Sequence, residues 1–180
     1  AMAGAGGLGV IHRYNSIKDQ TSLVSKTISM LDGHPDAGYM FGVAVGVTGD
    51  YLERAKELYS AGARLLCFDI AHGHHVLMQR SLCEIKSYFG NDIHIMAGNI
   101  ANVDGFNDMA DWGADSIRVG IGGGSICSTR VQTGHGMPTL QSVLECSSSD
   151  RDAALIADGG IRTSGDIVKA LAAGADFVMI

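Results

Sequence analysis

The stretch AALIADGGIRTSGDIVKALAAGADFVMI, residues 153–180, contains the pattern from which the fold can be predicted. An apolar, strand-like run at 153–159 ends in a glycine-rich turn. An amphipathic helix follows, with Ser164 as its expected N-cap, and a Gly-Ala pair near its end leads into a second apolar run at 176–180. Strand, helix and strand in this order are typical of a parallel βαβ unit.

The same unit recurs upstream, where SAGARLLCFD and DWGADSIRVG again place Gly-Ala a few residues before an apolar run. Further strands are expected at 7–12, 40–46, 64–70, 93–99 and 116–121. Polar or glycine-rich segments follow at least four of the seven strands. Functional chemistry spread over that many strand ends favours a (β/α)8 TIM barrel, because a doubly wound sheet concentrates its site at one switch point.

A complete barrel has eight strands, so the predicted barrel is incomplete. The chain starts without an initiator Met and stops on a strand, and we therefore expect it to be a piece of a longer protein. Residues 1–180 are read as one partial barrel domain.

Composition excludes several classes of protein. With 46% hydrophobic and 18% charged residues, the chain is globular rather than disordered. A net charge of -6 argues against nucleic acid or an anionic membrane as a partner, and no apolar run is long enough to span a bilayer. The four cysteines form neither a disulfide framework nor a CxxC zinc pattern, which indicates a reduced, cytoplasmic protein.

The segment GIGGGSICST, residues 120–129, is the strongest candidate for chemistry. Backbone N–H groups of a glycine-rich turn form an anion site, and Ser125 adds a hydroxyl. Cys127 is a candidate nucleophile if nearby N–H groups lower its pKa. A tight turn without a ligand, and a cysteine that is merely packed, are the alternatives.

Three other strand ends carry polar residues. Asp158, before Gly159 and Gly160, suits ribose hydroxyls next to a phosphate-binding turn, although a capped helix behind a turn would use the same residues. Asp69 is expected to contact a cofactor, because a buried unpaired carboxylate would be costly. Asn99 can hydrogen-bond a substrate edge.

The histidines after Asp69 (His72, His74 and His75) match no strong zinc spacing, so a metal site there is a minor alternative.

Four motifs together, GIGGGSICSTRVQTGHGMP, IADGGIRTSGDIVKALAAGADFVM, AGN and DIAHGH, resemble the IMP dehydrogenase/GMP reductase family over nearly the whole chain. The resemblance implies a barrel lacking its first strand, in which Cys127 attacks C2 of a purine nucleotide to form a covalent thioimidate. Thr129 matches the neighbouring catalytic threonine. The resemblance implies further positions at Ser125, Gly159 and Gly160 for the phosphate, Asp158 for the ribose, Arg118 and Asn99 for the base, and Asp69, Ala71, Asn99 and Gly122 for NADPH or NAD.

The family also implies a K+ site made by the carbonyls of Gly122, Gly124 and Cys127, and a homotetramer. Gly123 stands where the usual motif has proline, a departure that would loosen the loop and weaken the case for the ion.

The foremost functional hypothesis is GMP reductase, which converts GMP and NADPH to IMP and ammonia. The segment 22–39 between the second and third barrel strands is too short for a regulatory CBS insertion, which favours the reductase. IMP dehydrogenase, which makes XMP from IMP and NAD, is the alternative within the family. An FMN-dependent barrel enzyme and a non-catalytic nucleotide-binding fragment are the alternatives outside that chemistry. All purine hypotheses require Cys127 to lie outside the packed interior and close to the turn at 159–160.

Overall fold

Seven parallel strands form one sheet, and they follow one another in chain order across it. The coordinates are a computed structural model, which describes residues 2–31 and 34–180. The strands are β1 (Gly9–Ile11), β2 (Phe41–Val45), β3 (Leu65–Asp69), β4 (His94–Ile100), β5 (Ser116–Val119), β6 (Ala154–Asp158) and β7 (Phe177–Met179).

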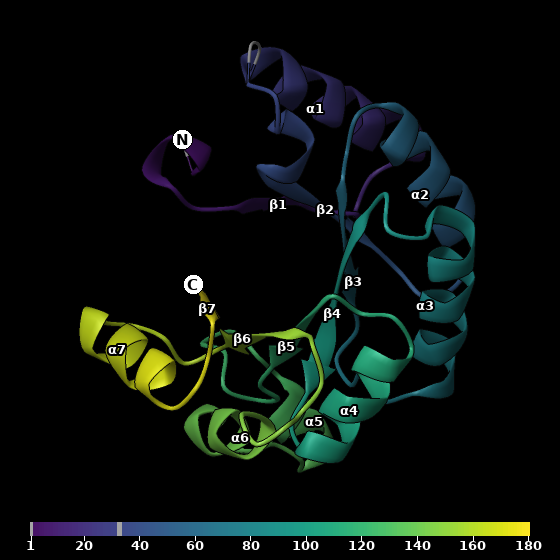
Figure 1. The fold of residues 1–180 in the computed structure, drawn as a ribbon. Coiled ribbons are helices and arrows are strands. Elements are labelled where there is room, and N and C mark those ends of the chain that lie inside the picture. Colours follow the sequence, from purple (N-terminus) through teal and green to yellow (C-terminus); the bar gives the residue numbers. More distant parts are fainter. Residues whose placement is uncertain (1, 32–33) are drawn as a thin grey trace.

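Helices alternate with these strands and lie on the convex side of the curled sheet (Figure 1). The α-helices are α1 (Ile17–Met30), α2 (Tyr51–Ser60), α3 (Val76–Phe89), α4 (Val103–Asp111), α5 (Thr129–Thr133), α6 (Thr139–Cys146) and α7 (Ser164–Ala172), and the 3-10 turns are η1 (Ala3–Ala5) and η2 (Ala37–Tyr39). β1 and β7 lie at the two ends of the curl, on either side of an opening (Figure 1). This architecture confirms the predicted α/β class and is that of an incomplete TIM barrel.

The two faces of the sheet have different partners because side chains alternate along each strand. Outward residues such as Leu66, Phe68 and Ile117 are fully buried and pack with the helices in the main core. Inward residues form a smaller cluster of four buried side chains, Leu65, Cys67, Met96 and Ile156. Burial on both faces explains why the strands read as continuous apolar runs in the sequence.

One helix start differs from the prediction. The N-cap of α7 is Thr163, and Ser164 is the first helical residue. Thr163 has extended backbone and its hydroxyl accepts a hydrogen bond from the N–H of Asp166, whose carboxylate in turn accepts from the backbone of Thr163. This reciprocal capping box satisfies two backbone donors, and Ser164 has no equivalent partner three residues on.

The glycines of the three Gly-Ala pairs, Gly62, Gly113 and Gly174, have φ between +104° and +109° and directly follow the last capping residue of their helices. The predicted glycine stops are therefore confirmed.

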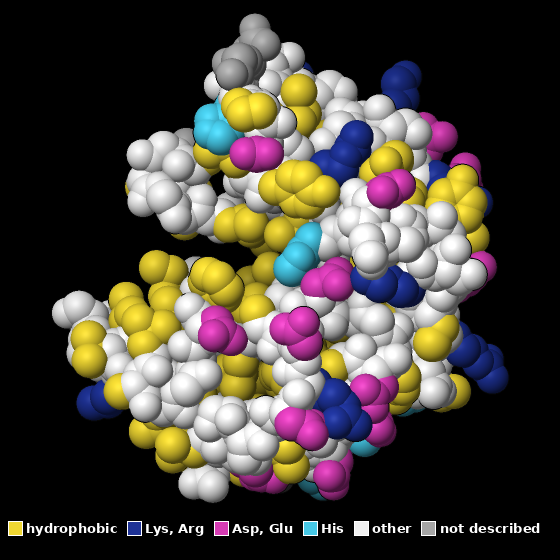
Figure 2. Space-filling model, in the orientation of Figure 1, with side chains coloured by type: hydrophobic (Ala, Val, Ile, Leu, Met, Phe, Trp, Pro, Cys, Tyr) yellow, Lys and Arg dark blue, Asp and Glu magenta, His cyan; other side chains and the backbone are white. Residues whose placement is uncertain are grey.

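All strands except β4 are two or three residues shorter than predicted, and the shortest are the edge strands β1 and β7, which each pair with a single neighbour. Hydrophobic side chains border the opening between them (Figure 2), and Phe177 of β7 is 61% exposed. Asp32 and Gly33, within the short connection after α1, lie outside the described residues. Among residues 2–31 and 34–180, no helix is long and apolar enough to cross a membrane.

Candidate active site

The cysteine loop, residues 120–128, joins the carboxyl end of β5 to α5. Cys127 is half-buried in this loop and lies outside both hydrophobic clusters. Its sulfur is 3.3 Å from the hydroxyl Oγ1 of Thr129, and its N–H donates to the carbonyl of Gly124. The loop thus folds back on itself around the thiol.

The surroundings of Cys127 lower the pKa of its thiol below the ordinary value. The largest cause is the hydrogen bond with the Thr129 hydroxyl, followed by the backbone N–H of Thr129; the N–H of Gly122 adds a smaller contribution. Two other cysteines behave in the opposite way, because burial raises the pKa of Cys67 and raises that of Cys146 to about 12. Of these three cysteines, Cys127 alone is both accessible and biased toward the thiolate.

The cysteine loop packs directly against the turn after β6. A Cβ atom added to Gly159 would lie 2.9 Å from the backbone nitrogen of Gly124, and one added to Gly160 would lie 3.5 Å from the carbonyl oxygen of Gly123. The loop that carries the thiol and the turn at 159–160 are therefore neighbours, a condition of the purine-nucleotide hypotheses.

Backbone donors of this turn are free to bind an anion. Gly159 and Gly160 have φ of +90° and +81°, and in the described part of the chain their N–H groups and that of Ile161 donate to no backbone carbonyl. Ser125 is exposed on the facing loop. N–H groups of a glycine turn that have no backbone partner are the type of donor that binds a phosphoryl group, and the loop that packs against this turn carries the Ser125 hydroxyl.

Gly123 makes a close contact with the start of α6. A Cβ atom at this position would lie 2.4 Å from the Thr139 hydroxyl oxygen, which is itself buried without a hydrogen-bond partner. A side chain at position 123, including a proline ring, would therefore meet Thr139 unless Thr139 moved.

Asn99 and Asp158 are brought together at the rim. β4 pairs with β5 through Gly98 opposite Arg118 and Ile100 opposite Val119, so Asn99 is an extra residue in the ladder. Such a β-bulge re-aims a side chain. The Asn99 amide Nδ2 donates to the Asp158 carboxylate at 2.7 Å and to the carbonyl of Gly120 at 2.8 Å.

Arg118 and Asp69 form a second pair on the concave face. Arg118 is 6% exposed, and its guanidinium donates to the Asp69 carboxylate at 2.6 Å and to the carbonyl of Phe68 at 3.2 Å. The carboxylate is 44% exposed, so it is accessible to a ligand as well. Ala71 lies exposed in the loop that follows.

Three rim residues were missed by the sequence analysis. His12, Arg13 and Tyr14, together with Asp69 and Arg118, line a cavity of about 180 Å³ on the concave face, which extends into the opening between the edge strands, where Val10 of β1 and Met179 of β7 also line it. Their position in the sequence could have predicted them, because they directly follow the first strand and so lie at the same rim as the other candidate residues.

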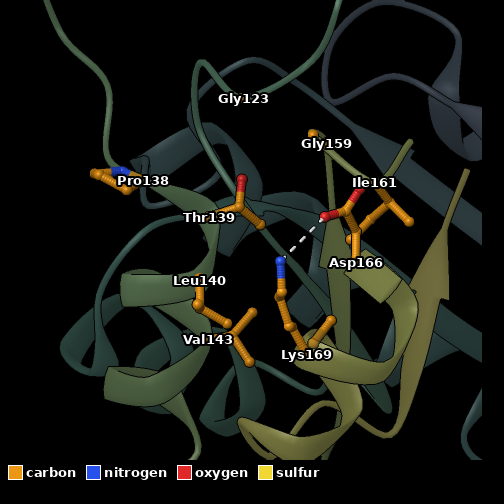
Figure 3. A pocket seen from close by; sticks show the side chains of 11 residues that line it. Gly123, Pro138, Thr139, Leu140, Val143, Gly159, Ile161, Asp166 and Lys169 are labelled. Atoms are coloured by element: carbon orange, nitrogen blue, oxygen red, sulfur yellow. Dashed lines mark ion pairs between the residues drawn. The ribbon is translucent and has the colours of Figure 1, made fainter. Parts of the chain in front are cut away.

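A larger cavity of about 360 Å³ lies between α6 and α7, beneath the two glycine turns (Figure 3). Thr139 and Lys169 point into it, and the Lys169 ammonium lies 3.8 Å from the Asp166 carboxylate. Cys127 lines neither cavity. The larger cavity therefore lies on the α6 and α7 side of the turn at 159–160 and does not open onto the Cys127 thiol.

The histidine segment has local partners. His74 Nε2 is 2.8 Å from the Asp108 carboxylate, and the His75 ring accepts from the N–H of Leu77 at the start of α3. In residues 2–31 and 34–180, no three His, Cys, Asp or Glu side chains cluster as a metal site.

Comparison with known proteins identifies a family model over the whole chain and relatives over most of it. The family model described as IMP dehydrogenase / GMP reductase domain matches residues 1–180. An inosine-5'-monophosphate dehydrogenase from Nitrosopumilus maritimus is 45% identical over 89% of this chain and 35% of its own length. A GMP reductase from Leishmania major is 46% identical over 77% of this chain and 29% of its own length.

The fold has a solved counterpart. A crystal structure of GMP reductase from Trypanosoma brucei matches with a TM-score of 0.75 and 45% identity, over 78% of this chain and 32% of that one. The chain thus spans about a third of the length of these relatives.

Proposed function

The chain belongs to the IMP dehydrogenase/GMP reductase family, and we propose that the protein containing it is a purine-nucleotide oxidoreductase that acts at C2 of the base. Residues 1–180 are its partial barrel domain. The observation that carries the proposal is the contact between two loops: the one that holds a Cys127 thiol of lowered pKa, and the glycine turn after β6. A thiolate beside a phosphate cradle is the arrangement that covalent chemistry on a nucleotide requires.

The substrate would lie along this rim from phosphate to base. Ser125 and the N–H groups of Gly159 and Gly160 bind the phosphate, and Asp158 accepts hydrogen bonds from the ribose hydroxyls. Asn99 keeps the Asp158 carboxylate oriented through its 2.7 Å hydrogen bond. The Thr129 hydroxyl stabilises the Cys127 thiolate before it attacks.

For the direction of the reaction we propose reduction of GMP. Cys127 Sγ forms a bond to C2 as the C2–N bond to the exocyclic amine breaks, and the amine takes up the proton that the Cys127 thiol has lost and leaves as ammonia. C2 then receives a hydride and the C–S bond breaks to release IMP and the thiolate. The short connection between β1 and β2, with no room for a CBS insertion, supports this direction.

IMP dehydrogenase is the alternative direction. In this case C2 of IMP loses a hydride, and water cleaves the cysteine adduct to give XMP. The relative from N. maritimus supports it, because that dehydrogenase aligns with 89% of the chain.

The concave face fits a nicotinamide dinucleotide. Arg118 keeps a buried Nε without a hydrogen-bond partner, and the accessible Asp69 carboxylate lies beside it. Asp69, Ala71, Asn99 and Gly122 would hold NADPH or NAD there, and the bound dinucleotide supplies or accepts the hydride. Arg118 would contact the base.

A K+ ion would be held by the carbonyls of Gly122, Gly124 and Cys127. The Gly124 carbonyl already accepts from the N–H of Cys127, and its second lone pair remains for an ion. A homotetramer is the assembly that we propose for the native protein, and light scattering tests it.

The test is an assay of the full-length protein that contains this chain. GMP with NADPH should lose absorbance at the nicotinamide wavelength and release ammonia, whereas IMP with NAD should gain that absorbance. Cys127→Ala should bind the nucleotide without turnover, and Cys83→Ala, at an exposed cysteine on α3, should retain activity. Nucleotide binding without turnover in the native protein would refute the proposal and favour a binding role, and a flavin spectrum would favour FMN chemistry.

A further inference from the structure

A buried polar network lies between α1 and α2, just below the rim of the concave face. Gln20 of α1 is fully buried, and Arg54 of α2 is 7% exposed. Burying an amide and a guanidinium is costly unless their polar atoms are hydrogen-bonded. Their partners therefore show what these residues contribute.

Gln20 joins the carboxyl ends of the first two strands. Its amide Nε2 donates to the carbonyl of His12, directly after β1, at 3.1 Å, and to the carbonyl of Ala44 in β2 at 2.9 Å. Both donors of one amide group are thus used to hold two adjacent strand ends at a set separation.

Arg54 extends this network to the loop after β1. Its Nη1 donates to the Gln20 side-chain oxygen at 2.8 Å and to the carbonyl of Asn15 at 3.3 Å. Its other two nitrogens donate to the Asp50 carboxylate at 3.3 and 2.7 Å, which compensates the buried charge. The segment 12–15 is therefore held at its first and last carbonyl groups.

The side chains inside this segment face the concave cavity. His12, Arg13 and Tyr14 line it opposite Asp69 and Arg118, whereas Gln20 and Arg54 do not. The network can therefore act on a ligand only by fixing the backbone that carries these three side chains.

We propose that Gln20 and Arg54 are positioning residues for the dinucleotide-binding side of the site, which hold segment 12–15 in its ligand-binding geometry. This inference rests on the proposed function, since it assigns the concave face to the nicotinamide dinucleotide. Loss of the network is expected to weaken binding at this face and to leave the cysteine loop unaffected, because that loop follows β5 and packs against the turn after β6.

The experiment uses the full-length protein with Arg54→Met, which keeps the length of the side chain and removes its donors. Arg80→Met is the matched control, since Arg80 is exposed on α3. For Arg54→Met we expect a KM for the dinucleotide about tenfold higher with kcat within about twofold. Faster amide hydrogen exchange in residues 12–15 and an unchanged rate of Cys127 alkylation should accompany it. Arg54→Lys, which restores a donor and the charge, should recover part of the affinity.

A KM and exchange pattern equal to those of Arg80→Met would overturn the proposal. The proposal would also be overturned if Arg54→Met changed the KM, the rate of Cys127 alkylation and the amide hydrogen exchange of the whole chain together, because that pattern indicates general destabilisation. If Arg54→Met does not fold, Asp50→Asn, at a half-exposed carboxylate, should show the same pattern with a smaller amplitude. If the wild-type protein turns over neither substrate pair, the proposed function fails. Amide hydrogen exchange of residues 12–15 in Arg54→Met still tests whether the network holds this segment.

Discussion

The side-chain amide of Asn99 donates a 2.7 Å hydrogen bond to the carboxylate of Asp158, two residues that are 59 positions apart in the chain. The same amide donates to the carbonyl of Gly120, so one side chain joins the carboxyl ends of β4, β5 and β6. Asn99 therefore determines how the Asp158 carboxylate faces the rim. In the proposed nucleotide site, Asn99 would therefore act by orienting this carboxylate.

Replacing Asn99 by Ala should weaken nucleoside monophosphate binding by about tenfold, because the Asp158 carboxylate loses its fixed orientation. Asn99→Asp should be worse at neutral pH, since two carboxylates would then face each other. Isothermal titration calorimetry measures both. Asn91→Ala, in an exposed turn after α3, should bind as the wild type does; equal affinity of Asn99→Ala would show that the bridge has no role in binding.

Replacing Thr129 by Val should raise the pKa of the Cys127 thiol, because the largest cause of its lowering is the Thr129 hydroxyl. The midpoint of the pH profile for iodoacetamide alkylation of Cys127 should shift upward. The rate at pH 7 should fall by about three- to tenfold, since less thiolate is present. Mass spectrometry of the Cys127 peptide provides the rate, and Thr27→Val on α1 is the control. An unshifted midpoint would mean that the thiol is tuned by its backbone neighbours alone.

Replacing Gly159 by Ala should separate the two glycine loops. The new Cβ would meet the backbone nitrogen of Gly124 at 2.9 Å, and φ of +90° is strained for alanine. We expect a loss of about 1–3 kcal/mol of stability and a loss of phosphate-dependent nucleotide binding. Gly49→Ala is the matched control, because its φ of +68° adds backbone strain with no atom within 4 Å. Thermal melts with and without nucleotide separate the loss of stability from the loss of nucleotide binding. Identical melts of Gly159→Ala and Gly49→Ala would exclude a role for the loop contact.

Replacing Asp166 by Asn should loosen the turn that precedes α7. The Asp166 carboxylate accepts hydrogen bonds from the Thr163 hydroxyl and from the N–H groups of Arg162 and Thr163, which lower its pKa below 3.8. A lowered folded-state pKa contributes stability that is present above pH 3.8 and is lost as the pH falls through the lowered value. The difference in melting temperature between wild type and Asp166→Asn should thus be constant near neutral pH and shrink in acid. Asp152→Asn, at an exposed loop residue, serves as control, and a difference that grows in acid would contradict the sign of this linkage.

The sequence was sufficient where the interactions are local. Apolar runs and Gly-Ala stops placed all seven strands, because strand burial and helix termination each depend on a few neighbouring residues. Local patterns were less reliable at boundaries. The capping box with Asp166 selects Thr163 over Ser164 at the start of α7, and most strands begin or end a residue or two inside the predicted range.

Residue order by itself determined the alternation of strand and helix, and with it the gathering of Cys127, Asp158 and Asn99 at one rim, because parallel strands bring their carboxyl ends to the same edge. The tertiary structure alone decided how these side chains are oriented and which residues hold them. The bulge turns Asn99 toward Asp158, Gly123 packs against Thr139, and Arg54 donates to the carbonyl of Asn15. Each of these contacts joins residues of different elements that are distant in the chain. Such contacts depend on the register of neighbouring strands and on the packing of helices over them, which no local pattern encodes.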